Sequence, residues 1–340
     1  MTIAVYGAGG IGCYVGGRLA AGGAEVIFIG RPRLAGEVAE HGLRLTDYLG
    51  ADLVVPAGEV RYETTPDAAS EADLVLVTVK SAGTAAAADE LAAVLKPGAT
   101  VVSFQNGIRN GEVLQERLPE HTVLTGMVPF NVLNRGGGAF HQGTEGKLDV
   151  QRHPALTPYL GAFDDAGLPL TLHDEILPVQ WAKLLLNLNN PVNALSDLPL
   201  RDELAQRAYR RCLAVAQLET LALLKAAGIT PAQITALPAH RLPALLSLPD
   251  FLFKLLASKM LAIDPLARTS MWEDLQAGRK TEIDYLNGEV VRLAESLGLA
   301  APVNAKLIEL IRTAEAGRSV AMPGATLLRE LWSAAAAPAS

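Results

Sequence analysis

The chain has 340 residues, of which 50% are hydrophobic and 19% charged, and its formal net charge is −7. A chain of this length is longer than an ordinary domain with a single hydrophobic core, and suggests two domains of ~150 residues each. The composition excludes a largely disordered chain, and the acidic balance argues against nucleic-acid binding, which requires a basic surface to neutralise phosphates.

Cysteine usage and hydropathy argue against a metal site and a membrane span. Cys13 and Cys212 have neither the spacing of a disulfide framework nor that of metal ligands, so we expect two buried thiols in a reducing compartment and no metal. The leucine-rich stretch 242–262 is interrupted by prolines and charged residues, which makes it a poor membrane span. The segment TIAVYGAGG shows no features of a signal peptide. We therefore expect a cytoplasmic protein without membrane or nucleic-acid partners.

Short β-rich runs alternate with Ala-rich helical segments in the first half of the chain. Near-continuous apolar runs separated by helices are typical of parallel strands that are covered by helices on both faces. The segment AFHQGTEGKLDVQ (139–151) follows three glycines and predicts antiparallel strands that extend the sheet. The predicted parallel strands are TIAVY (2–6), EVIFI (25–29), LVLVTV (74–79), TVVSF (100–104) and TVLTGM (122–127).

The first predicted strand leads directly into a GxGxxG motif that opens a helix. Its members are Gly7, Ala8, Gly9, Gly10, Ile11 and Gly12. In this context the first glycine permits a tight turn, the second lets the backbone approach a pyrophosphate, and the third allows close helix–strand packing. The helix N-terminus attracts the anion. The alternative is a glycine-rich turn used only for packing; we favour a dinucleotide site in a Rossmann-type domain.

Polar residues follow three of the predicted strands. Where NAD-binding proteins usually place an acid, the second strand is followed by Arg31 and Arg33. Arginine accommodates a 2′-phosphate, so the sequence predicts NADP rather than NAD. Lys80 follows the strand LVLVTV and could reach cofactor or substrate oxygens, or simply be solvated. Asn106 follows TVVSF and could bind substrate or nicotinamide, or satisfy its own loop in an Asx-turn.

The second half of the chain is predicted to be helical almost to its end. We expect a dinucleotide-binding domain at 1–176, a helical substrate and catalytic domain at 177–332, and a disordered tail at 333–340. The fold class is therefore α/β, with an N-terminal Rossmann-type doubly wound sheet plus a C-terminal all-α domain. The predicted helices are 178–190, 201–227, 265–277, 282–297 and one after residue 305.

The segment KLLLNLNNPVNAL (183–195) places polar groups in an apolar helix. The side chains of Lys183, Asn187 and Asn190, at i, i+4 and i+7, share one face of this helix. A buried amide without hydrogen-bond partners costs ~1–3 kcal/mol, so we expect this face to contact water, a ligand or other polar groups. Pro191 predicts a kink or break. A desolvated lysine has a lowered pKa and could protonate the alkoxide left by hydride transfer to a ketone. The alternative is a helix at a partly hydrated interface between the two domains.

A third polar cluster lies further along the chain. Asp264 and Pro265 have the pattern of a helix N-cap and first helical position, and Ser270 and Asp274 follow at i and i+4. Glu282 lies in the first turn of the next predicted helix, within a capping-box pattern. On the residues alone, Ser270 could be an ordinary hydroxyl and Glu282 could only compensate the helix dipole.

With these clusters assembled, the chain resembles the ketopantoate reductase (2-dehydropantoate 2-reductase) family over nearly its full length. TSM and TEIDYLNG at these spacings are the more specific features. The resemblance implies NADPH-dependent reduction of 2-dehydropantoate to (R)-pantoate, on the route to pantothenate and coenzyme A. The matching features are GAGGIG (7–12), Arg31, VTVK ending at Lys80, QNG (105–107), WAKLLLN (181–187), TSM (269–271) and TEIDYLNG (281–288).

The resemblance also implies a role for individual residues. Lys183 matches the general acid, and Asn187 matches an asparagine that holds this lysine or the substrate. Asn106 matches the active-site asparagine of the NG motif. Ser270 matches a serine that binds the substrate carboxylate, and Glu282 matches an acid that hydrogen-bonds the substrate or the lysine.

Two departures from the family pattern bear on the substrate. Pro191 stands where the family often has an asparagine, and we expect the flanking Asn190 and Asn193 to contact the substrate. Ala267 stands where an asparagine often precedes the TSM serine. These departures keep open a second hypothesis, a reductase of another 2-oxo acid.

A third hypothesis is a non-catalytic NADPH-binding regulator. The presence of Lys183, Ser270 and Glu282 argues against it, because a sensor needs no proton donor. The expected partner is a small-molecule 2-oxo acid, and the apolar helices of the second domain could form a homodimer interface or equally a single core.

Overall fold

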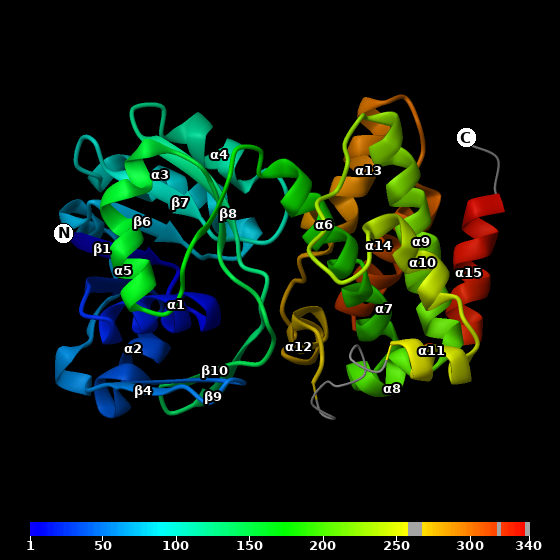
Figure 1. Cartoon of the computed structure of the whole chain (residues 1–340), viewed down its shortest axis with the longest axis horizontal. Coiled ribbons are helices and arrows are strands. Elements are labelled where there is room, and N and C mark those ends of the chain that lie inside the picture. The colour runs from blue at the N-terminus through cyan, green and yellow to red at the C-terminus, as the bar shows by residue number, and fades with distance from the viewer. Residues whose placement is uncertain (258–266, 318–320, 337–340) are drawn as a thin grey trace. The chain divides into compact units, whose positions relative to one another are not determined.

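A computed structural model of the chain describes residues 1–257, 267–317 and 321–336 (Figure 1). The chain folds into two compact units, Met1–Ile176 and Leu177–Ser340. The first unit contains the strands and the second is helical in its described residues. The predicted α/β fold class is confirmed.

The first unit is built on a sheet with the strand order β12-β11-β8-β7-β6-β1-β2-β5. All neighbouring strands from β8 to β5 pair in parallel. At the other edge, β11 is antiparallel to β8 and parallel to β12. The strands are β1 (Thr2–Tyr6), β2 (Glu25–Ile29), β5 (Arg61–Glu63), β6 (Leu74–Val77), β7 (Thr100–Ser103), β8 (Thr122–Met127), β11 (Asp149–Gln151) and β12 (Thr171–His173).

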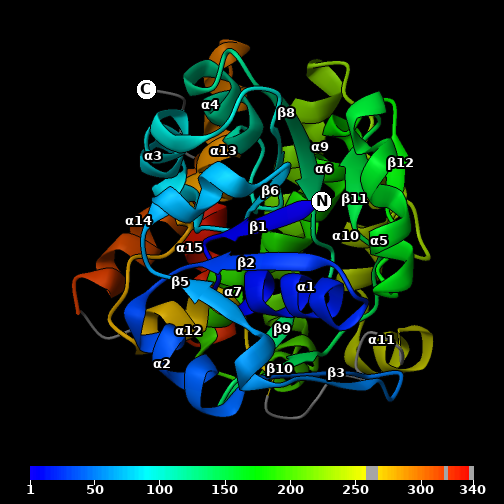
Figure 2. The ribbon, with the colours of Figure 1, turned by 90° about the vertical axis from the view of Figure 1, so that its left-hand side faces the viewer.

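Helices cover both faces of this sheet, as Figure 2 shows for α1 on one side and α3 and α4 on the other. Alternate residues of a strand point to opposite faces, so Ile3 and Val5 join the cluster that contains Tyr14 of α1, and Ala4 joins the cluster that contains Ala88 of α3. The sheet is therefore doubly wound. The helices of this unit are α1 (Gly10–Ala21), α2 (Pro32–His41), α3 (Thr84–Val94), α4 (Asn110–Arg117) and α5 (Leu160–Asp165).

A second, smaller sheet has the order β4-β3-β10-β9 and packs against α1. The prediction that residues 139–151 extend the main sheet is therefore only half right. Ala139–Gln142 pairs within the smaller sheet, and only Asp149–Gln151 extends the main sheet as an antiparallel neighbour of β8. The strands of the smaller sheet are β3 (Leu43–Asp47), β4 (Asp52–Val55), β9 (Val132–Gly136) and β10 (Ala139–Gln142).

The second unit is organised around the long helix α9, which contacts α7, α8, α10, α13, α14 and α15. None of the described helices is long and apolar enough to span a membrane. Its helices are α6 (Leu177–Asn187), α7 (Asn189–Ser196), α8 (Leu200–Leu204), α9 (Arg207–Ala226), α10 (Leu242–Leu246), α11 (Asp250–Leu256), α12 (Ser270–Gln276), α13 (Asn287–Ser296), α14 (Pro302–Glu315) and α15 (Gly324–Ala336).

The predicted break near Pro191 is present, but it lies earlier in the chain. Helix α6 ends at Asn187, Leu188 forms the junction, and α7 begins at Asn189. Pro191 is thus the third residue of a new helix, where its missing N–H would have had no intrahelical acceptor. The prediction of one helix over 178–190 is wrong, because Asn190 belongs to α7.

Other helix boundaries also differ from the predictions. The predicted helix 201–227 is divided because Gln206 has an extended backbone between α8 and α9. The predicted helix 282–297 begins only at Asn287, after a 3₁₀ turn at Ile283–Tyr285. The predicted tail 333–340 is wrong for residues 333–336, which belong to α15, and 337–340 lie outside the described residues.

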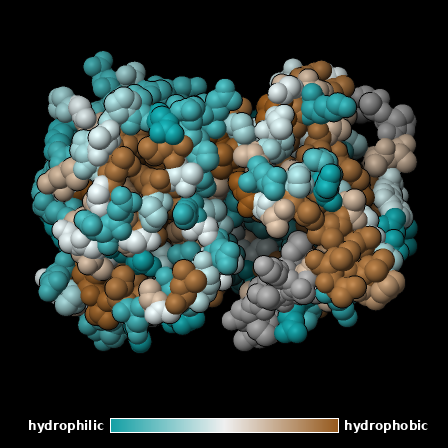
Figure 3. All heavy atoms as spheres, in the orientation of Figure 1, coloured by the Kyte–Doolittle hydropathy of each residue, from teal (hydrophilic) through white to brown (hydrophobic). Residues whose placement is uncertain are grey.

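Apolar side chains are exposed on the second unit. Figure 3 shows them gathered over α10 and α11 on one face. Phe251, Leu255 and Leu256 of α11 are 70%, 74% and 65% exposed. Single exposed apolar residues are ordinary, but a cluster on one short helix is a surface that could be covered.

Candidate functional site

The GxGxxG motif forms the turn between β1 and α1, and each glycine has the geometry that its predicted role requires. Gly7 has φ +92°, and a Cβ there would lie 2.6 Å from the backbone nitrogen of Val79. A Cβ on Gly12 would lie 2.6 Å from Thr78 Oγ1, so helix and strand pack too closely for a side chain. At Gly9 the nearest atom would be 3.8 Å away, which leaves this backbone open to a ligand. These contacts fit a dinucleotide turn.

Helix α1 begins immediately after this turn without a side-chain cap and without an acidic residue in its first turn. The first amide groups of a helix lack intrahelical acceptors and carry the positive end of its dipole. The N-terminus of α1 therefore suits an anionic group such as a pyrophosphate.

Tyr62 of β5 supports the same turn and was missed by sequence reasoning. Its hydroxyl donates a 2.9 Å hydrogen bond to the carbonyl of Ala8, and its ring stacks on Phe28 at a centroid distance of 6.2 Å. A side chain at Gly30 would collide with this hydroxyl, since a Cβ would lie 2.2 Å from Tyr62 Oη. Tyr62 thus joins the glycine turn to the end of β2. A tyrosine in a short strand gives no local sign of this role.

The two arginines after β2 differ in their surroundings. Arg33 forms an ion pair with Glu37 one turn along α2. Arg31 is the exposed N-cap of α2 with an extended backbone, directly beyond the end of β2. The arrangement makes Arg31 the better candidate of the two for a 2′-phosphate.

The ends of β6 and β7 carry a polar network around Asn106. The hydroxyl of Ser81 donates to the Asn106 carbonyl at 2.9 Å, and the Asn110 amide also donates to it. Buried Gln105 joins the two strand ends by donating to the Val79 carbonyl at 3.0 Å. Lys80 is exposed three residues beyond the end of β6, at the start of a 3₁₀ turn, and its contact with cofactor or substrate stays a prediction. The network holds the Asn106 backbone in place at the carboxyl ends of the strands, where ligands bind in open α/β sheets.

In the second unit, Lys183 and Asn187 share a face of α6 at i and i+4. Loss of solvation lowers the pKa of the Lys183 ammonium group from 10.5 to about 8. This is the direction expected for a lysine among apolar side chains, and it brings the group into the working range of a general acid. The prediction that Asn190 shares this helical face is wrong, because Asn190 lies beyond the junction at Leu188 and belongs to α7.

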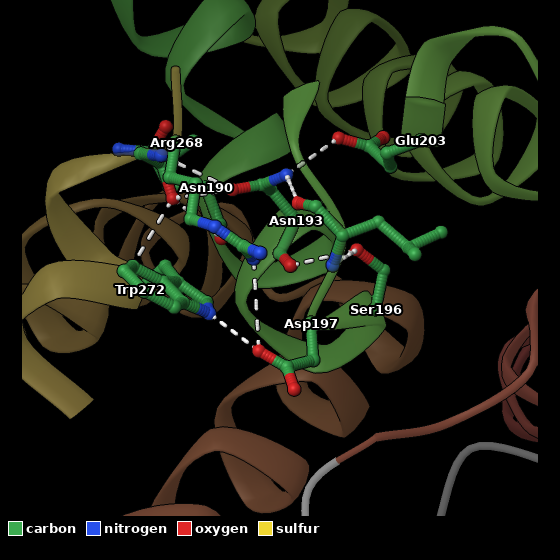
Figure 4. A network of polar contacts seen from close by, with 9 residues as sticks. Asn190, Asn193, Ser196, Asp197, Glu203, Arg268 and Trp272 are labelled. Atoms are coloured by element: carbon green, nitrogen blue, oxygen red, sulfur yellow. Dashed lines mark hydrogen bonds and ion pairs between the residues drawn. The ribbon is translucent and has the colours of Figure 1, made fainter. Parts of the chain in front are cut away.

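Asn193 is fully buried, and this contradicts its predicted role as a substrate contact (Figure 4). Its Nδ2 donates to the Leu198 carbonyl at 2.9 Å and to Glu203 Oε2 at 3.1 Å. Its Oδ1 accepts from the backbone nitrogen of Thr269 at 3.1 Å. Because both ends of the amide are used internally, Asn193 supports neighbouring segments and is not available to a ligand.

Ser270 is exposed at the first position of α12. The N-cap of this helix is Thr269, whose hydroxyl accepts from the backbone nitrogen of Trp272 at 3.4 Å. The N-cap predicted at Asp264 lies outside the described residues. Asp274 is buried and paired with Arg279 at 3.0 Å, so it has a structural role.

Glu282 lies in a tighter turn than predicted. It is the N-cap of the 3₁₀ turn at Ile283–Tyr285 and makes no side-chain cap there. The hydroxyl of Thr281 instead accepts from the Ile283 nitrogen at 3.3 Å and donates to Glu315 at 2.8 Å. The predicted capping box is therefore wrong, and dipole compensation of α13 does not explain Glu282.

A trio of residues beside Ser270 was also missed. Asp197, with φ 53°, accepts a 2.7 Å hydrogen bond from the Trp272 indole nitrogen and pairs with Arg268 at 3.6 Å (Figure 4). The Arg268 guanidinium lies over the Trp272 ring at 4.0 Å from its centroid. No group of three or more His, Cys, Asp and Glu side chains is placed to hold a metal ion within residues 1–257, 267–317 and 321–336.

Together these features define an α/β protein whose first unit is a Rossmann-type doubly wound sheet with a glycine turn and whose second, helical unit carries a lysine of lowered pKa. Residues 3–155 match the family model described as ketopantoate reductase PanE/ApbA, and residues 175–315 match the model of its C-terminal region. The chain belongs to the ketopantoate reductase family, a family of oxidoreductases.

Individual relatives agree with this membership. A 2-dehydropantoate 2-reductase of Halobacterium salinarum is 29% identical over 334 residues, which cover 93% of this chain and 99% of that protein. The crystal structure of a PanE/ApbA family ketopantoate reductase from Ralstonia eutropha JMP134 is similar, with a TM-score of 0.79 and 30% identity over 93% of this chain and 99% of that one.

More distant structures share the fold. D-mandelate dehydrogenase, solved with NADH and anilino(oxo)acetate, has a TM-score of 0.78 at 20% identity and covers 93% of this chain and 99% of its own. A dimeric ketopantoate reductase from Staphylococcus aureus has a TM-score of 0.69 at 16% identity and covers 94% and 100%.

Proposed function

We propose that the protein reduces 2-dehydropantoate to (R)-pantoate with NADPH, in the biosynthesis of pantothenate and coenzyme A. NADPH would supply the hydride that the ketone carbon takes up, and Lys183 Nζ would give the proton that converts the developing alkoxide into the hydroxyl group. The products are (R)-pantoate, NADP⁺ and a neutral lysine that regains its proton from solvent. Membership of the ketopantoate reductase family supports the reaction and its substrate.

The observation that carries the mechanism is the state of Lys183. With a pKa of about 8, its ammonium group is still protonated at neutral pH, yet it gives up a proton far more readily than an ordinary lysine. Asn187, one turn further on the same face, is placed to orient either the lysine or the substrate.

The remaining roles belong to the proposal, and all but that of Asn190 follow the family pattern. Ser270 at the start of α12 binds the substrate carboxylate, and Asn190 contributes a further polar contact. Asn106 hydrogen-bonds the substrate or the nicotinamide, and Glu282 hydrogen-bonds the substrate or the lysine. Asn193 is no longer among the proposed substrate contacts, because its amide is used internally.

The proposed cofactor is NADPH, held at the glycine turn and the N-terminus of α1, with Lys80 contacting its oxygens. Its preference over NADH rests on Arg31, an exposed cation where an NAD-binding protein would place an acid. D-mandelate dehydrogenase, a structural relative, was solved with NADH, and a comparison of kcat/KM with NADPH and NADH tests the preference of this chain.

The test is NADPH oxidation by the purified protein in the presence of 2-dehydropantoate. Steady turnover supports the proposal, and loss of turnover in Lys183→Ala with unchanged NADPH binding supports the mechanism. No turnover on this substrate would refute the substrate assignment. NADPH binding without turnover on any 2-oxo acid would favour the regulator hypothesis.

A second candidate is reduction of another 2-oxo acid. Pro191 and Ala267 depart from the family pattern beside the proposed substrate residues, and the fold is shared with a mandelate dehydrogenase. Ranking branched and aromatic 2-oxo acids by kcat/KM separates the two candidates, because the physiological substrate should lead by more than an order of magnitude.

We also propose a homodimer, since one structural relative is dimeric and the exposed apolar residues of α11 offer a surface that a second copy could cover. Sedimentation velocity at several concentrations measures this directly, and a monomer at all concentrations would refute it. A cytoplasmic location stays a prediction.

A further inference from the structure

Glu203 is a buried carboxyl group that the proposed reaction does not use. It lies on the short helix α8 and is fully buried. Its Oε2 accepts hydrogen bonds from two side-chain amides of α7, at 3.0 Å from Asn189 Nδ2 and 3.1 Å from Asn193 Nδ2. Removing a carboxylate from water costs free energy, so a glutamate in this position is expected to have a role.

No cation neutralises Glu203 among its described hydrogen bonds and ion pairs. From α9, Tyr209 and Cys212 face it, and both have pKa values raised by burial, that of Cys212 to about 12. Arg210 of the same helix donates to the Leu204 carbonyl and pairs with Asp250. Burial raises the pKa of Glu203 itself to about 8, against the opposing effect of its two amide donors.

The unsatisfied atoms around Glu203 agree with a protonated carboxyl. Glu203 Oε1 and Asn189 Oδ1 are buried and have no hydrogen-bond partner within the described part of the chain. Both oxygen atoms can only accept hydrogen bonds if Glu203 is ionised, because a carboxylate has no hydrogen to donate. A neutral carboxyl supplies one O–H donor, and it still accepts from both amides through Oε2.

A chain of hydrogen bonds runs from Glu203 to the start of α12 (Figure 4). Glu203 holds Asn193 Nδ2, and the other end of the same amide accepts from the backbone nitrogen and the hydroxyl of Thr269, at 3.1 and 3.2 Å. Thr269 caps α12, its one hydroxyl hydrogen has the Asn190 carbonyl at 3.4 Å as an alternative acceptor, and Ser270 is the next residue.

We propose that Glu203 is a positioning residue: its carboxyl group fixes the Asn193 amide, and through it the Thr269 cap that sets the position of Ser270 against α7. The inference rests on the proposed function only in taking Ser270 and Asn190 as substrate contacts. Ionisation of Glu203 removes its O–H donor and leaves a negative charge without a cation in this buried position, which destabilises the chain of contacts and lowers affinity for the substrate carboxylate.

Glutamine reproduces the neutral carboxyl, since its oxygen can accept both amides and its NH₂ supplies the donor. At pH 7, Glu203→Ala should raise the KM for the 2-oxo acid about tenfold, as expected for a supporting residue, while kcat and the KM for NADPH stay within about twofold. Glu203→Gln should restore the KM, and Asp202→Asn, on the exposed side of α8, is the matched control. An unchanged KM in Glu203→Ala, or no rescue by glutamine, would overturn the proposal.

The pH dependence separates Glu203 from Lys183. In the unaltered protein, KM should rise as pH increases through about 8, while in Glu203→Gln it should stay flat; the fall of kcat that Lys183 causes should remain in both proteins. Equal KM profiles in the two proteins would contradict the proposal.

A measurement without substrate keeps the inference separable from the proposed function. The indole N–H signal of Trp272, which bonds Asp197 beside Thr269, can be followed by NMR in the full chain labelled at tryptophan, and assigned with Trp272→Phe. It should titrate between pH 6 and 9.5 in the unaltered protein and not in Glu203→Gln. A signal that titrates identically in both proteins would refute the link even if the enzyme acted on another substrate.

Discussion

The hydroxyl group of Tyr62 donates a 2.9 Å hydrogen bond to the carbonyl of Ala8, a residue 54 positions earlier in the chain. The bond ties strand β5 to the glycine turn from which α1 starts. The same hydroxyl occupies the space that a side chain at Gly30 would need. One tyrosine therefore holds both backbone segments that border the proposed adenosine end of the cofactor.

Removing this hydroxyl should weaken cofactor binding without unfolding the protein. In Tyr62→Phe the stack on Phe28 remains, while a hydrogen bond worth ~0.5–1.5 kcal/mol is lost, so the Kd for NADPH should rise several-fold. Fluorescence titration of the full chain measures this. Tyr48→Phe, at a partly exposed tyrosine, is the control, and an equal Kd in both variants would contradict the role.

Cofactor selectivity should depend on Arg31 and not on Arg33. A charge-assisted hydrogen bond to a 2′-phosphate contributes ~1.5–3 kcal/mol, so Arg31→Ala should reduce the NADPH-to-NADH ratio of kcat/KM by about tenfold or more. Arg33 is paired with Glu37, and Arg33→Ala should change the ratio little. A native protein that prefers NADH would refute the assignment before any variant is made.

The rate of the chemical step should follow the protonation of Lys183. A general acid works only in its protonated form, so kcat should fall as pH rises through about 8. Lys183→Arg keeps the charge but holds its proton too tightly, and should lose ~10²–10⁴-fold in kcat with a nearly normal KM. Lys225→Ala, at an exposed lysine of α9, controls for the loss of a cation; a normal kcat in Lys183→Arg would exclude Lys183 as the acid.

Stability should also depend on pH through Glu203. Its pKa is raised from 4.5 to about 8 on folding, so the folded chain binds this proton more tightly than the unfolded chain. The stability that the neutral carboxyl contributes is complete below pH 4.5 and is lost progressively as pH rises toward 8. The Tm of Glu203→Gln relative to the unaltered protein should therefore increase between pH 5 and 8.5 in calorimetric scans. A constant difference would show that the carboxyl does not change its protonation in this range.

The glycine turn offers a stability test with an internal control. In Gly12→Ala the new Cβ would lie 2.6 Å from Thr78 Oγ1 and 2.9 Å from Val5 Cγ1, so overpacking should cost ~1–3 kcal/mol and lower the Tm. Gly36 lies within α2 with no atom near the position of a Cβ, so Gly36→Ala should be neutral or stabilising by ~0.5–1 kcal/mol. Equal Tm values for the two variants would contradict the packing role of Gly12.

Local patterns were sufficient for much of the first unit. β1, β2 and β8 have the predicted bounds, and the strands predicted at 74–79 and 100–104 end one or two residues early, at Val77 and Ser103. The smaller sheet was missed, since strands such as Leu43–Asp47 are short and gain their stability from pairing with distant residues. In the second unit, the helix break was predicted at Pro191, because proline is the strongest helix-breaking residue nearby, whereas the structure has it three residues earlier, at Leu188.

The sequence by itself determined the doubly wound sheet, the glycine turn and Lys183 with Asn187 on one helical face. These features depend on strand alternation, glycine spacing and helical periodicity within a few neighbouring residues. Only the tertiary structure decided that Asn193 is internal and that Glu203 is buried against it. Packing between residues 193, 203 and 269 decides which polar side chain is available to a ligand and which forms hydrogen bonds inside the protein. No local sequence pattern contains the distances between these residues.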